Sequence, residues 1–133
     1  MKYSYNDAGR LTSFRPKQKQ DCVVRAFALV SNCTYDHAYE TFAMLGRKCG
    51  RSTPKKVWQS YLNGHLRFTR IAFPAVAGCP RMSLEVFCAT FNTGRYFVQL
   101  AGHLTAVIDG TVYDEFEPRK AACVYAAWMV MFI

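Results

Sequence analysis

Three residues of this chain, Cys22, His103 and Asp114, are of the types that together can form a nucleophilic catalyst. A thiol becomes a strong nucleophile when a base takes its proton, and a carboxylate can orient an imidazole so that it acts as that base. Cys22 opens the apolar stretch CVVRAFALVS, which predicts a helix that is buried on most sides. A cysteine at a helix start lies near unpaired amides and the positive end of the helix dipole, and both favour the thiolate.

A predicted hairpin brings the other two residues together. The strand-like runs HLTAVI and TVYDEF flank Asp109-Gly110, a strong signal for a two-residue turn. With that turn Thr105 faces Asp114, and the alternation of side chains puts His103, Thr105 and Asp114 on one face of the sheet. Asp114 is then the diagonal neighbour of His103, within reach of a hydrogen bond. Asp109 lies about 20 Å along the strand from His103 at ~3.3 Å per residue, so it is expected to serve the turn.

The elements that must position these residues predict an α+β domain, with helices first and an antiparallel sheet after them. Residues 1–19 are polar, aromatic and basic, and are expected to form an arm or loop. Asp21, Thr34 and Ser83 are predicted helix caps. Helices are predicted at 22–31, 35–45, 54–62 and 84–91, and strands at 66–73, 95–101, 103–108, 111–116 and 121–130.

Length and composition indicate one domain over residues 1–133. The chain has 133 residues, of which 51% are apolar, enough for a single hydrophobic core. The start has no apolar stretch typical of a secretory signal, and the longest apolar run, 121–133, is shorter than the roughly 20 residues that span a bilayer. We therefore expect no membrane segment and a cytoplasmic location, which is the host cytoplasm if the protein is encoded by a phage.

The cysteines other than Cys22 are expected to be structural thiols. The six cysteines include no closely spaced pair, and a cytosolic location favours reduced thiols. A zinc site built from His65 and any of them lacks the usual ligand spacing. We expect no metal and no cofactor.

The order of the candidate residues resembles that of the papain-like cysteine peptidase superfamily, over residues 18–116. The likeness is closest to small peptidases of the bacteriocin-processing type and to compact bacterial and phage relatives with a DC-x-x-RA helix start. The resemblance implies a papain-like fold in which Cys22 is the nucleophile, His103 the general base and Asp114 the residue that orients it. Cofactors are not part of this chemistry.

The resemblance also implies a glutamine upstream of the nucleophile as an oxyanion donor. Gln18 and Gln20 are both available, and Gln20 is preferred because it lies close enough to the helix start to present its amide beside Cys22. The backbone N–H of Cys22 would be the second donor. Asp21 opposes formation of the thiolate by its negative charge, unless it caps the helix and directs its carboxylate at backbone amides.

These observations predict a thiol hydrolase, a cysteine protease that cleaves a peptide or isopeptide bond through Cys22, His103 and Asp114. A deamidase or transferase would use the same residues. The alternative is a papain-like scaffold whose chemistry is unused, such as a phage protein that binds or inhibits a host protein.

The charge of the chain bears on its partners. A net charge of +8, with a pI near 9.4, favours an acidic protein or peptide partner, although the basic residues are scattered along the sequence. Together with the aromatic residues Tyr3, Tyr5 and Phe14, that charge leaves nucleic-acid binding as a third alternative. The sequence gives no indication of the oligomeric state.

Overall fold

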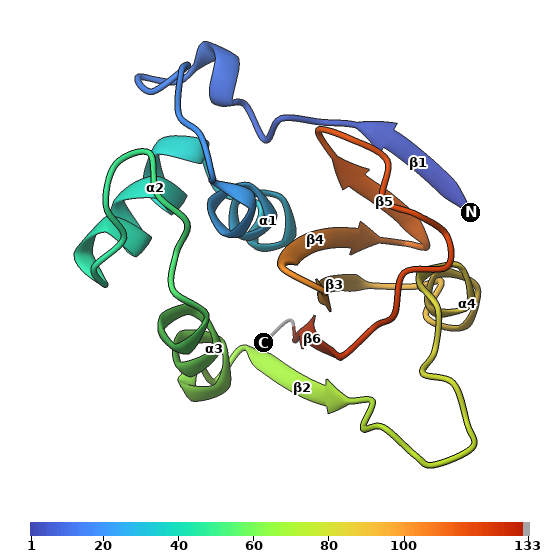
Figure 1. The fold of residues 1–133 in the computed structure, drawn as a ribbon. Helices are drawn as coiled ribbons and strands as arrows, with labels where there is room; N and C mark the ends of the chain where they lie inside the picture. The colour runs from blue at the N-terminus through green and yellow to red at the C-terminus, as the bar shows by residue number, and fades with distance from the viewer. Residues whose placement is uncertain (132–133) are drawn as a thin grey trace.

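The centre of the fold is a six-stranded sheet, which the computed structural model describes within residues 1–131 (Figure 1). The strand order is β1-β5-β4-β3-β6-β2. Every neighbouring pair is antiparallel except β1 and β5, which are parallel, so the sheet is mixed. The strands are β1 (Lys2–Tyr5), β2 (Phe68–Ala72), β3 (Arg95–Leu100), β4 (His103–Ile108), β5 (Thr111–Asp114) and β6 (Ala126–Val130).

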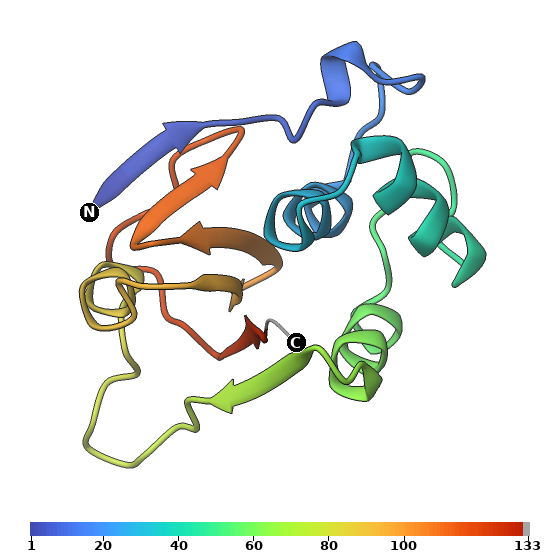
Figure 2. The same ribbon diagram turned by 180° about the vertical axis from the view of Figure 1, so that it is seen from behind.

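Helices cover both faces of this sheet (Figures 1 and 2). The helices are α1 (Cys22–Ser31), α2 (Tyr35–Met44), α3 (Lys55–Gly64) and α4 (Leu84–Thr90), with a short 3-10 turn at Arg10–Thr12. The first three helices share one hydrophobic cluster with the sheet, and α4 belongs to a second. None of the helices within the described residues has both the length and the apolar composition needed to cross a bilayer.

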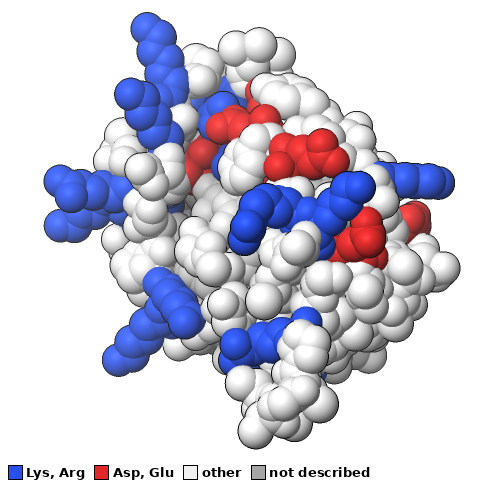
Figure 3. Space-filling view, turned by 45° about the vertical axis from the view of Figure 1, so that its right-hand side comes forward, with Lys and Arg blue, Asp and Glu red and all other residues white. Residues whose placement is uncertain are grey.

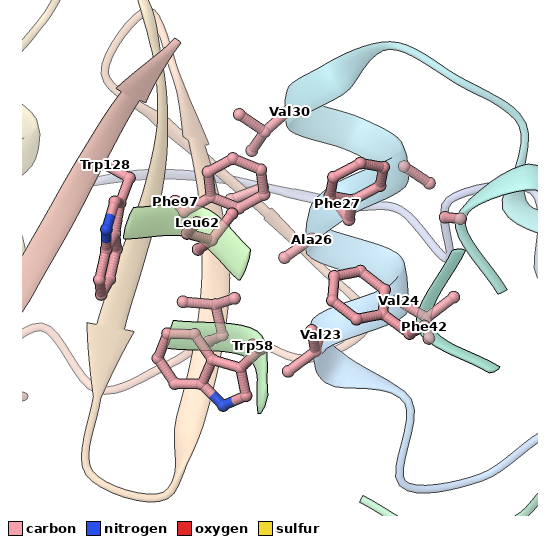
Figure 4. Close-up of a cluster of buried hydrophobic side chains, with 14 of the residues drawn as sticks. Val23, Val24, Ala26, Phe27, Val30, Phe42, Trp58, Leu62, Phe97 and Trp128 are labelled. Carbon is pink, nitrogen blue, oxygen red and sulfur yellow. The ribbon is translucent and has the colours of Figure 1, made fainter. Parts of the chain in front are cut away.

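Alternation of side chains along the strands separates the two clusters. On β3, Phe97 packs with α1 to α3, whereas Tyr96 and Val98 pack with α4. Trp128 on β6 repeats this pattern, because it joins the α1 side while its neighbour Ala127 joins the α4 side. Figure 4 shows side chains of the first cluster converging from three helices and the sheet: Val23, Val24, Ala26, Phe27, Val30, Phe42, Trp58, Leu62, Phe97 and Trp128.

The expected α+β architecture is confirmed, and one part of the sheet prediction is wrong. The segment 1–19 is not wholly an arm or loop, because Lys2–Tyr5 forms β1 at the edge of the sheet. Tyr3 packs against the second cluster, and its hydroxyl donates a hydrogen bond to the backbone oxygen of Asp114 over 3.0 Å. This pairing is parallel and spans most of the chain, so the sheet is not purely antiparallel.

The predicted hairpin has the expected register. Ile108 pairs with Thr111, and Asp109 and Gly110 both have positive φ, at 50° and 78°, as a two-residue turn of this kind requires. The Asp109 carboxylate accepts a hydrogen bond from the backbone N–H of Gly94 over 2.8 Å, so it serves the turn. The turn therefore sets how far β5 runs back along β4.

Replacing Gly110 by alanine tests this turn. A Cβ at position 110 would meet the carbonyl oxygen of Cys88 at 3.1 Å, whereas one at Gly9 would meet nothing within 4 Å. Both glycines have φ near 80°, which costs a non-glycine residue about 1 to 2 kcal/mol. We expect Gly110→Ala to lower the free energy of unfolding by more than Gly9→Ala does, as measured by urea denaturation. If both substitutions lower the free energy of unfolding equally, the contact with the Cys88 carbonyl does not contribute to stability at this turn.

Candidate active site

Cys22 is the first residue of α1, and α1 packs against β4 (Figure 1). Its side chain is partly buried, and its thiol interacts with the His103 side chain and with the backbone of Leu104. Burial raises the pKa of the Cys22 thiol, but the hydrogen bonds to His103 and Leu104 and the positive charges of His103 and Arg25 outweigh it and hold the pKa below its ordinary value. The site therefore favours the thiolate.

His103, the first residue of β4, connects Cys22 to Asp114. Its Nε2 lies 2.6 Å from Oδ2 of Asp114, so Nδ1 is the ring nitrogen that remains for Cys22. Burial lowers the pKa of His103, but hydrogen bonds to Asp114 and Cys22 and their negative charges raise it to about 9. The ring of Phe116 lies against the imidazole with a centroid distance of 5.0 Å. The imidazolium is thus the favoured form beside the thiolate.

Asp114, at the end of β5, is buried and fully used as an acceptor. Thr105 Oγ1 donates to Oδ2 over 2.7 Å, and Arg25 Nη1 and the backbone N–H of Glu115 donate to Oδ1 over 2.7 and 2.8 Å. Burial raises the pKa of this carboxyl, but His103, Thr105 and Arg25 together lower it below its usual range. Asp114 is therefore ionised, and it holds the His103 ring in one orientation.

Asp21 does not cap α1 through its side chain, contrary to expectation. Its carboxylate accepts hydrogen bonds from Arg25 Nε over 3.1 Å, from Arg10 Nη1 over 3.0 Å and from the Tyr35 hydroxyl over 2.8 Å. Two guanidinium groups offer stronger hydrogen bonds than backbone amides do, and they offset the negative charge. Asp21 therefore opposes the Cys22 thiolate much less than its place in the sequence suggests.

Three residues of this network, Arg10, Arg25 and Tyr35, were not recognised in the sequence as part of the site. Arg25 had a detectable signal, because it is the one charged residue in an otherwise apolar helix and lies one turn after Cys22. Arg10 also pairs with Glu115, after β5, but it comes from the short 3-10 turn Arg10–Thr12, and no local pattern there points to either partner. The three residues that the sequence did predict as the triad, Cys22, His103 and Asp114, lie together in the structure.

The two candidate glutamines differ in what their side chains already bind. Gln18 accepts hydrogen bonds from Arg47 and from the backbone N–H of Gly50, and its Nε2 lies 3.5 Å from Cys49 Sγ. Gln20 is exposed and accepts one hydrogen bond, from Ser52 Oγ over 3.0 Å. Its amide nitrogen donates to none of the described side chains. Gln20 is therefore better placed than Gln18 to donate to a bound substrate.

Two clefts meet at Cys22 and His103. The smaller has a volume of about 300 Å³ and runs toward α3 and the end of β3. The larger, of about 640 Å³, runs between the loop before α1 and the segment after β5, and Gln20 lines it. A chain lying across both clefts would pass over the thiol of Cys22.

Basic side chains border the larger cleft. Lys17 and Lys19 line it and make no salt bridge among the described residues, whereas Arg10 and Arg25 are neutralised by acidic partners. On the face that Figure 3 shows, the basic side chains project in separate places, with acidic side chains beside some of them and only uncharged residues between those along the left edge. The net charge of +8 therefore does not form one continuous patch on that face.

The remaining cysteines are free thiols that lack such partners. Burial raises the pKa of Cys33 and raises that of Cys88 to about 11. The exposed Cys49 has a pKa lowered by its contacts with Gln18 and Tyr39, but no histidine interacts with it. Within residues 1–131 no three His, Cys, Asp or Glu side chains are grouped closely enough to hold a metal ion.

Comparison with known proteins gives no family assignment. No protein-family model, curated protein or solved structure matches this chain. The papain-like assignment therefore stays a prediction. What the site can do has to be inferred from its own residues and contacts.

The ion pairs of Arg25 can be tested through stability. Arg25→Met leaves the buried carboxylates of Asp21 and Asp114 without their shared partner, and breaking a buried pair costs about 3 to 5 kcal/mol. The folded-state pKa values of both carboxyls are lowered, so this contribution is present above a carboxyl pKa of about 4 and is lost as the pH falls. We expect Arg25→Met to lower the free energy of unfolding, measured by urea denaturation, by more at pH 7 than at pH 3.

Arg15→Met is the matched control, because Arg15 pairs with Asp36 and Glu40 at the surface and is expected to contribute less than about 1 kcal/mol. If Arg25→Met lowers the free energy of unfolding by as little as Arg15→Met does, or by an amount that does not change with pH, a structural role for the buried network is contradicted.

Proposed function

We propose that the protein is a thiol hydrolase that cleaves a peptide or isopeptide bond, with Cys22 as nucleophile. The observation that supports this most is the shared position of His103, which interacts with Cys22 on one side and lies 2.6 Å from Asp114 on the other. The pair also lies where two clefts meet, so a substrate can reach it. A nucleophile, a base that interacts with it and a carboxylate that orients the base, placed in a cleft, are what acyl transfer requires.

In the proposed reaction the Cys22 thiolate attacks the carbonyl carbon, and the electron pair of the C=O bond moves to oxygen. The backbone N–H of Cys22, in the first turn of a helix where amides lack intrahelical partners, and the Gln20 side chain stabilise that oxyanion. His103 gives its proton from Nδ1 to the leaving nitrogen, and the C–N bond breaks to leave a thioester. Water, deprotonated by His103, then attacks the thioester and releases the acid and the thiol.

The charges around the site support a thiolate at neutral pH. His103 and Arg25 both lower the pKa of Cys22, and Asp114 keeps His103 in its cationic form. Asp21, the acid next to Cys22, is paired with two arginines. The cation needed to stabilise the thiolate is therefore held in contact with it, whereas the nearest anion is neutralised.

We infer a papain-like scaffold from the same features. The nucleophile begins a buried helix, and the histidine and the acid lie on adjacent strands after it, which is the order in the papain-like superfamily. A deamidase or transferase would use the same residues and differ only in the leaving group or the acceptor. Lys17 and Lys19 beside the larger cleft favour an acidic segment in the substrate.

The proposal predicts selective alkylation of Cys22. At pH 6 a thiol of ordinary pKa, about 8.5, is less than about 1% ionised, whereas Cys22 is held as a thiolate by His103. Iodoacetamide at pH 6 should modify Cys22 at least about tenfold faster than Cys33 or Cys88, as followed by mass spectrometry of the digested protein. His103→Ala should remove the selectivity at Cys22.

Cys49 provides an internal control, because its lowered pKa does not depend on His103 and its labelling should be the same in His103→Ala. If all the cysteines react slowly and equally at pH 6, the hydrolase proposal is wrong, and a scaffold that only binds a partner becomes the better hypothesis. In that case Cys22→Ser would leave partner binding unchanged.

Gln20 can be tested by comparing two reactions of the same thiol. Acylation by p-nitrophenyl acetate passes through an oxyanion, whereas alkylation by iodoacetamide does not. Loss of one oxyanion donor typically slows acyl transfer by about 10² to 10³. Gln20→Ala should therefore slow the burst of p-nitrophenolate by about that factor and leave the alkylation rate of Cys22 unchanged.

Gln18→Ala is the matched control, because the Gln18 side chain is already bound to the loop of Arg47 and Gly50. A similar slowing of both reactions in Gln20→Ala would assign Gln20 to the structure of the site, and an unchanged burst would remove it from the proposed mechanism.

A further inference from the structure

Gln99, near the end of β3, is a buried polar residue on the side of the sheet that packs against the first hydrophobic cluster. Alternation places it on the same face as Phe97, toward α1 and α3. It is only 9% exposed. Positions that break their own pattern are often functional, because a buried polar group destabilises the fold unless it is satisfied.

One end of the Gln99 amide is bound, and the other is free. Gln59 Nε2, on α3, donates to Gln99 Oε1 over 3.0 Å and so fixes the orientation of the amide. Gln99 Nε2 donates to no described residue, yet it is not among the buried polar atoms that are sealed off without a partner. Gln99 lines the smaller cleft beside Cys22, so its Nε2 is available to a molecule bound there.

The walls of the smaller cleft are mainly apolar. Its volume of about 300 Å³ lies at the lower end of small-ligand sites and suits a single amino-acid side chain. No Asp or Glu lines it, and apart from the Cys22–His103 pair its one charged residue is Lys55, which is exposed. The apolar lining consists of Val23, Trp58, Leu100, Ala101, Leu104 and Tyr125.

We propose that this cleft binds an uncharged substrate side chain that ends in a hydrogen-bond acceptor, best of all glutamine, and that Gln99 determines this specificity. The inference rests on the proposed hydrolase function, because the bound side chain belongs to a residue close to the bond that Cys22 attacks. The apolar walls contact the methylene groups of the glutamine side chain, and Gln99 Nε2 donates to its terminal oxygen.

Other side chains fit these features less well. A leucine or methionine would leave the Gln99 amide buried without an acceptor, which is what makes polar sites reject apolar analogues. A lysine would find no acid in the cleft. A glutamate would bring a charge into a mainly apolar cleft where Gln99 offers a neutral donor, and burying a charge costs more than burying an amide.

The test measures how fast electrophiles with different side chains label Cys22. Two series are used, chloroacetyl amino-acid methylamides and peptidyl vinyl sulfones, which carry the side chain on opposite sides of the reactive carbon. Each series contains glutamine, methionine, glutamate and lysine. The reactions are run at pH 9, where a cysteine of even ordinary pKa is largely ionised, so Cys22 labels whether or not it is activated.

In the protein as it stands, the glutamine probe of at least one series should label Cys22 at least about tenfold faster than the methionine probe of similar shape. Gln99→Met removes the donor with little change in volume and should abolish or reverse that ratio. Gln59→Met, which releases the Gln99 amide but keeps it in place, should reduce the ratio without reversing it. Labelling of the exposed Cys49 should follow the intrinsic reactivity of each probe in every variant.

Equal rates for glutamine and methionine in both series, or a glutamine preference that persists in Gln99→Met, would overturn the proposal. These outcomes are separate from the test of the hydrolase itself. Slow labelling of Cys22 at pH 6 together with a glutamine preference at pH 9 would retain the cleft assignment and reject the hydrolase. Fast labelling of Cys22 at pH 6 without a glutamine preference at pH 9 would retain the hydrolase and reject the cleft assignment.

Discussion

The bridge that Arg25 makes between Asp21 and Asp114 is the interaction on which the site depends. Arg25 lies on α1 and Asp114 at the end of β5, so the bridge ties the helix that carries Cys22 to the strand that orients His103. All three of these charged side chains are buried, and a buried charge is tolerated only when it is paired. A displacement of α1 away from β5 would therefore break the buried ion pair between Arg25 and Asp114.

The bridge also contributes to the protonation states. Burial raises the pKa of Asp114, but His103, Thr105 and Arg25 together lower it, and the ionised Asp114 acts with Cys22 to raise the pKa of His103 to about 9. The imidazolium in turn lowers the pKa of Cys22, with a further contribution from the positive charge of Arg25. The Arg25 guanidinium thus adds to the effect of His103 on the thiolate, directly by its charge and indirectly through its hydrogen bond to Asp114.

The sequence predicted the parts of this arrangement that depend on local chemistry. Four helices, five of the six strands and the register of the hairpin followed from apolar spacing and from the turn residues Asp109 and Gly110. The partner of Asp21 could not be predicted in this way, because the choice between backbone amides and arginines depends on where Arg10 arrives. The parallel pairing of β1 with β5 is also non-local, since no turn connects the two strands.

The most informative residues in the sequence were those that broke the pattern of the element to which they belong. Arg25 interrupts an apolar helix, and Gln99 is a polar residue buried beside Phe97 on the same side of β3. Hydrophobic burial alone would favour an aliphatic side chain at both places. Each of these buried polar groups therefore needs a specific hydrogen-bond or ion-pair partner. For Arg25 the partners lie within the chain. The free end of Gln99 has no partner among the described residues, and Gln99 lines the cleft beside Cys22, where a substrate side chain would supply one.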